Sequence, residues 1–592
     1  MLALLLCQVA HCFSAKQLAN GQGLVRVVML FVLLAYAGGP VRAQQGNIGA
    51  HDPSTIIKDG NKYWVFYTGQ GVRSKYSTDL INWTNSQSVF TTFTRPSWIA
   101  SKVPAFVNEY WAPECIFMNG KFYLYYSCST FGSQRSGIGL ATNVTLDPAN
   151  PNYNWVDEGE VVSSMPNANG TANNSAPNAI DPALYRDANN NLWFTYGSFY
   201  GGIAVMQLNP ATGKPLNGVN TPQTIVANNP AFVNNSYPEA PYVKLYNGFY
   251  YLFINRGACC QRANSTTYRI QVGRSTSPTG PFVDKNGLNL NNNGGSPLLS
   301  TSGRYIGPGH AGIFEENGVS YFSHHYYDYE DNGNSKLDIA KLTWDATGWP
   351  VVSRDWLASG RYSIATAPGM NSLVWQAQGC TGAAGQPVTQ STRTGGSCQE
   401  WDVTSLGNGN YKIASALGGL TVGVATCSSA NGAALELGTY TNLSCQQFHL
   451  NQASDGSLVF ASVNGNRVVE VPFASSNPGT QLALYDYNGC LCQHWYPTFL
   501  APLATASSRK LANVSIYPVP AERGSFTVDL GSRSTADAAA VVVYNVQGRV
   551  VYREAFKAHQ VKLAVEAGLQ PGIYQVQVRQ GNASFTQKVS VL

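Results

Sequence analysis

Charged residues are scarce in this sequence: Asp, Glu, Lys and Arg make up 12% of the 592 residues, and the formal net charge is only +5. No run of Lys and Arg is dense enough to follow a phosphate backbone, which argues against nucleic acid as a partner. Long apolar runs are also missing. The run VVMLFVLLAYAGG near the N-terminus is shorter than the roughly 20 residues that span a bilayer, so no stable membrane span is expected.

The N-terminal apolar run has the pattern of an export signal. Arg26 precedes it, and VRA at residues 41–43 offers small residues for cleavage before Gln44. We therefore predict a signal peptide over residues 1–43 and a secreted or cell-surface protein. Of twelve cysteines, Cys7 and Cys12 would leave with the signal, and the remainder would lie in an oxidising compartment where disulfides persist.

The length and the composition indicate several β-rich domains. A chain of 592 residues is too long for one hydrophobic core. Aromatic residues make up 12% of the sequence, and Gly is frequent. This profile is typical of secreted β-proteins with many turns.

One pattern occurs five times in the first half of the chain: an acid or His, a Pro or Gly, a turn and an aromatic strand. The key positions are Asp52, Glu114, Asp181, Glu239 and His310, at intervals of about 60 to 70 residues. Short strands joined by DG, NG or NN turns at this period predict a five-bladed β-propeller. The same position of each blade should then point towards the central axis, so that five polar side chains converge.

Such a cluster has two interpretations. Any single Asp or Glu of the set could simply cap a turn, but turn chemistry does not require an acid at the same position of every blade. Clustered carboxylates perturb one another, so that some are protonated and others ionised. Glycoside hydrolysis needs this division, because one group donates a proton to the leaving oxygen and another acts as base or nucleophile.

The motifs at these positions resemble glycoside hydrolase family 43, and within it the arabinan endo-1,5-α-L-arabinanases. The resemblance covers residues 47–350 and implies a five-bladed propeller domain over residues 44–365. Its carrying motifs are AHDPS, STFGSQRSGIGLATN, NAIDPALYRD, SYPEAPYV, CCQRANSTTYRIQVGRSTSPTGPF and GPGHAGIF.

The resemblance assigns three catalytic carboxylates in an inverting mechanism. It implies that Asp52 is the general base that activates water, that Glu239 is the general acid, and that Asp181 orients Glu239. An ionised Asp181 would keep Glu239 protonated, because a second negative charge nearby is costly. An inverting pair is expected to lie roughly 6.5 to 9.5 Å apart, with water between base and sugar.

The resemblance also implies a metal site. His310 of GPGH matches a residue that holds a hydrated calcium ion in arabinanases of this family. One imidazole with water ligands is an unusual calcium site, because calcium prefers oxygen. The alternative is a hydrogen-bonded channel histidine without an ion.

The remaining candidates are assigned to substrate binding. Gly132, Asn178 and Ser198 lie in matching motifs and are expected to contact sugar, and Trp111 is either a stacking platform or a core residue. Glu114 joins this set as a fourth channel acid without a catalytic role. The adjacent Cys259 and Cys260 form either a vicinal disulfide that stiffens a substrate loop or two thiols. They are not expected to bind metal, since no second Cys/His pair with zinc spacing accompanies them.

A different repeat begins beyond residue 370. CQEW at Cys398, CQQF at Cys445 and CQHW at Cys492 are each 47 residues apart, and they resemble ricin B-type β-trefoil lectin modules over residues 370–500. The Gln-x-aromatic residues of that family are chiefly core, and its sugar sites use an acid about 23 residues before the Gln. Only Glu470 keeps a carboxylate in that register, which leaves one candidate sugar site.

Cysteine spacing within the trefoil repeats predicts two disulfides. Cys380 precedes Cys398, and Cys427 precedes Cys445, by the same 18 residues. The third repeat has Ala474 at the corresponding position. Cys490 and Cys492 therefore have no predicted partners.

The last segment, residues 511–592, alternates apolar and polar residues as a small β-sandwich does. YPVP, NVQGR and PGIYQVQV resemble the C-terminal sorting domain of type IX secretion cargo. The alternative is an ordinary accessory sandwich. A sorting domain would make the secretion machinery a partner.

The predicted architecture is thus all-β, with a propeller, a trefoil and a C-terminal β-sandwich. The leading hypothesis is an extracellular hydrolase that cleaves α-1,5-L-arabinan internally. Three alternatives are an exo-acting arabinofuranosidase or arabinanase, a β-xylosidase on the same propeller, and a non-catalytic glycan-binding protein. The last would be expected to lack a catalytic carboxylate, yet all three are present.

Overall fold

The computed structural model describes most of the chain from Gln44 onwards. It covers residues 44–503, except 92, 231–235, 261–265, 355, 368–371 and 408, and residues 509–592, except 511–513, 523, 532–538, 545–549, 557–559, 567 and 581–582. The predicted signal peptide lies outside the described residues. The chain divides into two compact units, Met1–Ala501 and Pro502–Leu592. Across the described ranges, no helix is both long and apolar enough to cross a membrane.

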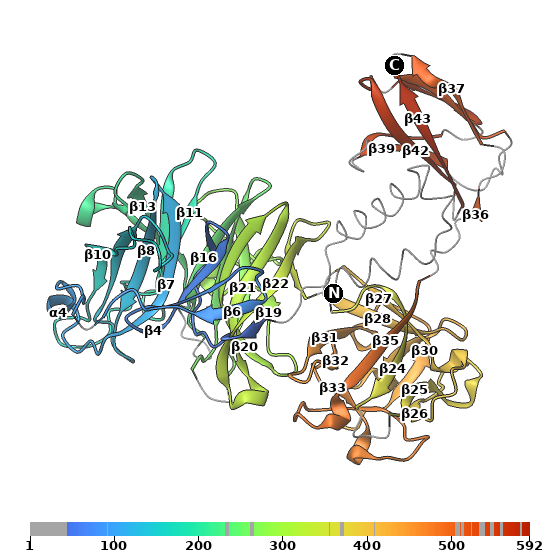
Figure 1. Cartoon of the computed structure of the whole chain (residues 1–592), viewed down its shortest axis with the longest axis horizontal. Helices are drawn as coiled ribbons and strands as arrows, with labels where there is room; N and C mark the ends of the chain where they lie inside the picture. Colours follow the sequence, from blue (N-terminus) through green and yellow to red (C-terminus); the bar gives the residue numbers. More distant parts are fainter. Residues whose placement is uncertain are drawn as a thin grey trace, which may run out of the picture. The chain divides into compact units, whose positions relative to one another are not determined.

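Five separate β-sheets, one for each predicted repeat, follow one another along the chain up to Ser353 (Figure 1). Their strand orders are β1-β6-β5-β3-β2, β10-β9-β8-β7-β4, β11-β12-β13-β14 with β15 beside β13, β16-β17-β18-β19, and β20-β21-β22-β23. The predicted five-bladed propeller is confirmed.

The first two sheets contain β1 (Gln45–Gly46), β2 (Ile57–Asp59), β3 (Lys62–Tyr67), β4 (Gly69–Gln70), β5 (Arg73–Ser77), β6 (Asn82–Asn85), β7 (Glu109–Met118), β8 (Lys121–Cys128), β9 (Ser136–Asn143) and β10 (Val156–Ser164). The third and fourth contain β11 (Ala183–Arg186), β12 (Leu192–Tyr196), β13 (Ile203–Asn209), β14 (Lys214–Pro215), β15 (Gln223–Ala227), β16 (Glu239–Tyr246), β17 (Phe249–Arg256), β18 (Arg269–Ser275) and β19 (Ser296–Leu299). The fifth contains β20 (Tyr305–Glu316), β21 (Val319–Asp328), β22 (Asn334–Trp344) and β23 (Pro350–Ser353). The short helices of this region are α4 (Ile99–Lys102), η1 (Gly218–Asn220), η4 (Leu290–Asn292) and η5 (Tyr329–Asp331).

The hydrophobic core of the propeller lies between neighbouring blades. Trp64 of β3 packs in a buried cluster with Leu124 of the second sheet. Val65, the next residue of β3, packs in another cluster with Leu337 of the fifth sheet. Successive side chains of a strand point to opposite faces, so the alternating apolar residues of each blade fill the interfaces on both of its sides.

The N-terminal segment closes the ring onto the last blade. The Ala50 N–H donates to the Ser335 carbonyl oxygen over 3.1 Å, and the Leu337 N–H donates to the Ile48 carbonyl oxygen over 2.7 Å. This pairing places the residues just before Asp52 beside β22. The first and fifth blades therefore lie next to each other at this point of the ring.

The residues at equivalent positions of the five blades are not all the ones that the motifs align. Each blade has a residue with positive φ in or shortly before its inner strand: Asp52, Ala112, Asp181, Ala240 and His310. The expectation that all five polar residues share one position is therefore wrong for two of them. Glu239 lies one residue before Ala240, and Glu114 lies two residues after Ala112, at points where the ladder register shifts. A bulge of this kind redirects a side chain.

The second region of this unit is a continuous sheet with a central aromatic core, as predicted for the trefoil. Its strands are β24 (Gly360–Thr366), β25 (Val374–Ala377), β26 (Val388–Ser391), β27 (Trp401–Ser405), β28 (Asn410–Ser415), β29 (Thr421–Val424), β30 (Leu435–Gly438), β31 (Phe448–Gln452), β32 (Leu458–Ser462), β33 (Val468–Glu470), β34 (Ala483–Tyr485) and β35 (Trp495–Pro502). Strand β24 falls within the range predicted for the propeller, but it pairs with β27. The trefoil sheet therefore begins at Gly360.

The repeated glutamines of the trefoil are structural. Gln399, Gln446 and Gln493 end the short helices η8 (Ser397–Gln399), η10 (Ser444–Gln446) and η12 (Leu491–Gln493). Each side-chain oxygen accepts from the backbone N–H five residues earlier, and each side-chain nitrogen donates to the carbonyl seven residues earlier. The remaining short helices are η7 (Gln378–Cys380), η9 (Ala425–Cys427) and η11 (Pro472–Ala474).

The described residues contain four disulfides. The predicted Cys380–Cys398 and Cys427–Cys445 bonds are confirmed. The neighbouring Cys490 and Cys492 are also joined, and so are the adjacent Cys259 and Cys260. Cys115 and Cys128 are free and buried in the propeller.

The second unit is a β-sandwich around its own apolar core. Strand β37 pairs with β38 on one side and with β43 on the other. The strands are β36 (Arg509–Lys510), β37 (Ser515–Glu522), β38 (Ser525–Asp529), β39 (Ala539–Tyr544), β40 (Val550–Ala555), β41 (Lys562–Glu566), β42 (Gly572–Gln580) and β43 (Ala583–Val591).

Candidate active site

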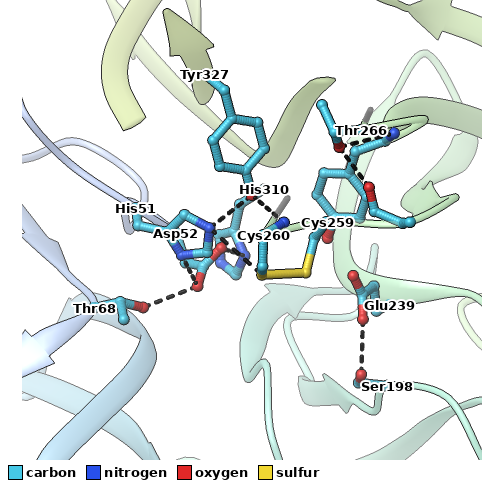
Figure 2. Close-up of a disulfide and its surroundings, with 12 residues drawn as sticks. His51, Asp52, Thr68, Ser198, Glu239, Cys259, Cys260, Thr266, His310 and Tyr327 are labelled. Carbon is cyan, nitrogen blue, oxygen red and sulfur yellow. Dashed lines mark hydrogen bonds and ion pairs between the residues drawn. A yellow bond between two sulfur atoms is a disulfide. The ribbon is translucent and has the colours of Figure 1, made fainter. Parts of the chain in front are cut away.

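Asp52 lies where the first and fifth blades meet, and its carboxylate has three close polar neighbours. One oxygen, Oδ2, accepts a hydrogen bond from the Thr68 hydroxyl over 2.9 Å and lies 2.8 Å from Nδ1 of His51 (Figure 2). The other, Oδ1, lies 3.5 Å from Nδ1 of His325. The Asp52 backbone N–H also donates to His325 over 3.1 Å. The carboxylate is therefore fixed by both blades.

These contacts keep Asp52 ionised. Burial alone would raise the pKa of Asp52, but the charge and hydrogen bond of His51 hold it far below its usual range. Burial would lower the pKa of His51, yet the Asp52 carboxylate raises it above 6.5. A proton shared by this pair therefore resides on His51, and Asp52 stays available as a base.

Two further histidines border Asp52. His310 lies in β20 with Nδ1 3.8 Å from Asp52 Oδ1, and burial lowers its pKa. Burial also lowers the pKa of His325 well below 6.5. Both imidazoles are therefore neutral and able to coordinate a cation. Of the described residues, His51, Asp52 and His325 lie close enough together to share a metal ion.

Glu239 begins β16 on the fourth blade and is buried. Its Oε2 accepts from the Ser198 hydroxyl over 2.9 Å (Figure 2), and it also shares a hydrogen bond with Tyr268. Asp181 lies beside the same strand: its Oδ2 accepts from the Ala240 N–H over 3.0 Å. Asp181 thus fixes the peptide that follows Glu239, and the orienting role that the family resemblance implies for it stays a prediction.

The protonation states of Asp181 and Glu239 depend on each other. Burial and repulsion by Glu239 raise the pKa of Asp181 well above 3.8. Burial raises the pKa of Glu239 as well, and the Asp52 charge adds to it, whereas the bonds from Tyr268 and Ser198 oppose the rise. Asp181 was expected to be plainly ionised, but burial and the charge of Glu239 disfavour its ionised form as well.

Glu114 is separate from these groups. Its Oε2 accepts from both the backbone N–H and the hydroxyl of Thr55, over 3.1 and 3.0 Å. Burial raises the pKa of Glu114 to about 7. The side chain therefore ties the second blade to the first, and its sugar contact stays a prediction.

The other predicted binding residues differ in their surroundings. Ser198 contacts Glu239 directly, and the carbonyl of Gly132 accepts from Tyr200, two residues after Ser198, over 3.2 Å. Asn178 is buried, and its side chain accepts from Ser164. Trp111 is only partly buried and belongs to none of the core clusters of the described residues.

The sequence motifs do not single out the side chains that surround the two acids. His325 and Tyr327 lie on β21, the second strand of the fifth repeat, and Tyr268 precedes β18. A signal was present, because the run SHHYY places two histidines in an otherwise apolar strand. Only the folded chain shows which of them reaches Asp52.

The third trefoil repeat has its acid, Glu470, at the position predicted for sugar binding. Gln493 donates to Glu470 Oε2 over 3.2 Å, and Gln399 makes the corresponding bond to Gln376 Oε1 over 2.8 Å. Gly423 occupies this position in the second repeat. One repeat of three therefore presents a carboxylate.

Family comparisons agree with this division of the chain. The model described as "Glycosyl hydrolases family 43" matches residues 47–350, "Ricin-type beta-trefoil lectin domain-like" matches residues 345–438, and "Secretion system C-terminal sorting domain" matches residues 515–592. The last match confirms the predicted sorting domain and the export of the protein from the cell.

Similar proteins include two curated extracellular enzymes. An exo-α-(1→5)-L-arabinofuranosidase of Cellvibrio japonicus is 37% identical over 53% of this chain and 88% of its own. An endo-α-(1→5)-L-arabinanase of Bacillus subtilis is 40% identical over 51% of this chain and 86% of its own. Among solved structures, an endo-arabinanase of Bacillus licheniformis is 39% identical, with a TM-score of 0.46, over 52% of this chain and 99% of that one.

Proposed function

Because the chain belongs to family 43 of the glycosyl hydrolases, we propose that it is an extracellular inverting hydrolase that cleaves internal α-1,5-L-arabinan linkages. The observation that carries this proposal is the placement of two acids in different environments. Asp52 lies 2.8 Å from His51 and accepts from Thr68, which favours its ionised form, whereas Glu239 is buried on the fourth blade beside Ser198, and burial raises its pKa.

The reaction follows from these charges. Asp52 removes a proton from a water molecule, whose oxygen attacks the anomeric carbon of the sugar. Glu239 donates its proton to the leaving oxygen as the glycosidic bond breaks, so neither residue becomes covalently attached. Asp181 acts on Glu239 in two ways. It fixes the adjoining Ala240 peptide, and it shares a buried site with Glu239 in which ionisation of both carboxyls is costly.

Calcium is part of the proposal only as a bound ion beside the site. The neutral imidazole of His310 would hold it through one nitrogen, and water would complete the coordination that calcium requires. Bound there, the ion would supply positive charge close to Asp52.

The second candidate is exo action, which the similarity to the Cellvibrio exo-enzyme favours. Product lengths from linear arabinan separate the two. Oligomers of mixed length early in digestion support endo action, whereas arabinose or one short product from the outset supports exo action. Branched arabinan and xylan in the same panel test the arabinofuranosidase and β-xylosidase alternatives.

A non-catalytic glycan-binding role is tested with the two acids. Asp52→Ala and Glu239→Ala should each abolish arabinan cleavage while the folded protein persists. Cleavage that survives both substitutions would refute the site. Deletion of residues 360–501 tests whether the trefoil contributes binding, with Glu470→Ala as the finer variant.

A further inference from the structure

The disulfide between the adjacent Cys259 and Cys260 lies directly beside the Asp52 group (Figure 2). Sγ of Cys260 is 4.0 Å from Nε2 of His51, and the Cys260 backbone N–H donates to the Tyr327 hydroxyl over 2.9 Å. Neither cysteine takes part in the proton transfers described above. Cys260 nevertheless contacts two side chains of the catalytic group, Tyr327 and His51.

These contacts continue without interruption to the base. The Tyr327 hydroxyl lies 2.8 Å from Nε2 of His51, and Nδ1 of the same ring lies 2.8 Å from Asp52. A phenol can donate to a neutral imidazole or accept from a protonated one, so the contact persists in either charge state of His51. The contacts therefore run from the disulfide to Tyr327, from Tyr327 to His51, and from His51 to Asp52.

Two features indicate that the disulfide holds the Cys260 N–H in place. Cys260 has a φ of 63°, in the left-handed region that non-glycine residues seldom adopt. A covalent ring through two adjacent side chains restricts the backbone at this point. Ala258, the residue before Cys259, is bonded on both sides: its N–H donates to the Thr267 hydroxyl over 3.0 Å, and its carbonyl accepts from Thr266.

Because Tyr327 is buried, its hydroxyl depends on hydrogen-bond partners within the protein. The tyrosine is only 4% exposed, and its ring packs against those of His51 and His325. If the Cys260 N–H moves away, the buried hydroxyl loses a donor that water cannot readily replace. The hydroxyl would then be less constrained, and so would the His51 ring that orients Asp52.

We propose that the Cys259–Cys260 disulfide positions the catalytic base, acting through Tyr327 and His51. The inference rests on the proposed role of Asp52. It assigns both cysteines and Tyr327 as positioning residues that do not themselves exchange protons with substrate. A dithiol such as dithiothreitol reduces the disulfide by transferring two electrons and two protons, giving two cysteine thiols and the cyclic disulfide of the reagent. Reduction should therefore impair the base.

The experiment measures kcat and KM on linear arabinan with the full-length protein, before and after reduction and after reoxidation. Alkylation and mass spectrometry verify that Cys259 and Cys260 are reduced. Because small displacements of a catalytic group cost up to about a hundredfold in rate, we expect kcat to fall between about tenfold and a hundredfold, with KM unchanged within about twofold. Reoxidation should restore the rate.

Three variants locate the effect. Cys259→Ser/Cys260→Ser should have the reduced protein's low kcat and should not respond to dithiol. Tyr327→Phe should also have a low kcat, and reduction should lower it little further, because the chain of contacts is already broken. The matched control is Cys380→Ser/Cys398→Ser, which removes a trefoil disulfide and should retain both full activity and the full response.

The outcomes separate this inference from the proposed function. An increase in KM alone would mean that the disulfide shapes a sugar-binding loop, which overturns the positioning role. So would an unchanged kcat in the double serine variant, or a full response to dithiol in Tyr327→Phe. If the oxidised wild-type protein cleaves no arabinan, the proposed function itself fails.

Discussion

Replacement of Asp181 by Asn should move the basic limb of the kcat/KM profile to lower pH. Asn keeps an oxygen that can accept the Ala240 N–H, the bond that Asp181 now makes over 3.0 Å, so the local structure should persist. In the wild-type protein the pKa values of both Asp181 and Glu239 are raised. The substitution removes one of these two ionisable groups, and with it one potential negative charge. Glu239 alone then loses its proton more easily.

The size of the shift follows from the charge interaction between the two buried acids. A like charge at such a site typically changes a carboxyl pKa by about 1 to 3 units. We expect the basic limb to move down by about 1 to 2 pH units, which corresponds to a loss of about tenfold to a hundredfold in kcat/KM above the new pKa. The assay is initial rate on linear arabinan at subsaturating concentration between pH 4 and pH 9.

Ser198→Ala is the matched control, because it should act in the opposite direction. The Ser198 hydroxyl donates to Glu239 and thereby lowers the pKa of this acid. Loss of the bond should move the basic limb to higher pH by about one unit, since hydrogen bonds to charged groups contribute about 1.5 to 3 kcal/mol. A basic limb that stays in place in Asp181→Asn, or that moves the same way in both variants, would refute the coupling.

The remaining predictions concern the base, a structural acid and the metal. Asp52→Ala and Glu239→Ala should each lower kcat by about a hundredfold or more in the arabinan assay, as expected for loss of a general base or acid; a smaller loss in either contradicts its role. Burial raises the pKa of Glu114 from 4.5 to about 7, so the folded state retains a proton that the unfolded state has lost. Wild-type stability relative to Glu114→Gln should therefore fall by about 3 kcal/mol between pH 4 and pH 8 in urea unfolding, and parallel curves would contradict this. EDTA should lower kcat/KM several-fold, with recovery on adding calcium, and His310→Gln should abolish the response; an unaffected wild type would argue against the ion.

The repeats made the fold predictable because each blade needs its own strands, turns and two apolar faces. The five motifs located Asp52, Asp181 and Glu239 in the chain, although the catalytic roles came from family resemblance. The repeats did not reveal that Ala240, and not Glu239, occupies the position equivalent to Asp52. A one-residue offset at a bulge depends on ladder register, which the motif pattern does not encode.

The environment of the base was also hidden from the sequence. Tyr327 and His325 come from a strand more than 270 residues away from Asp52, and their side chains reach it only because the ring closes between the first and fifth blades. Cys259 and Cys260 stood out as a pair in the sequence. Their contact with the base through Tyr327, however, required the fold.

Joint action of Asp52 and Glu239 in an inverting cleavage of internal arabinan linkages fixes both the configuration and the length of the products. Proton NMR of the first products from linear arabinan reports both properties at once. We expect newly formed β-anomers at the ends of oligomers of mixed length. Initial α-anomers, or free arabinose alone, would contradict it.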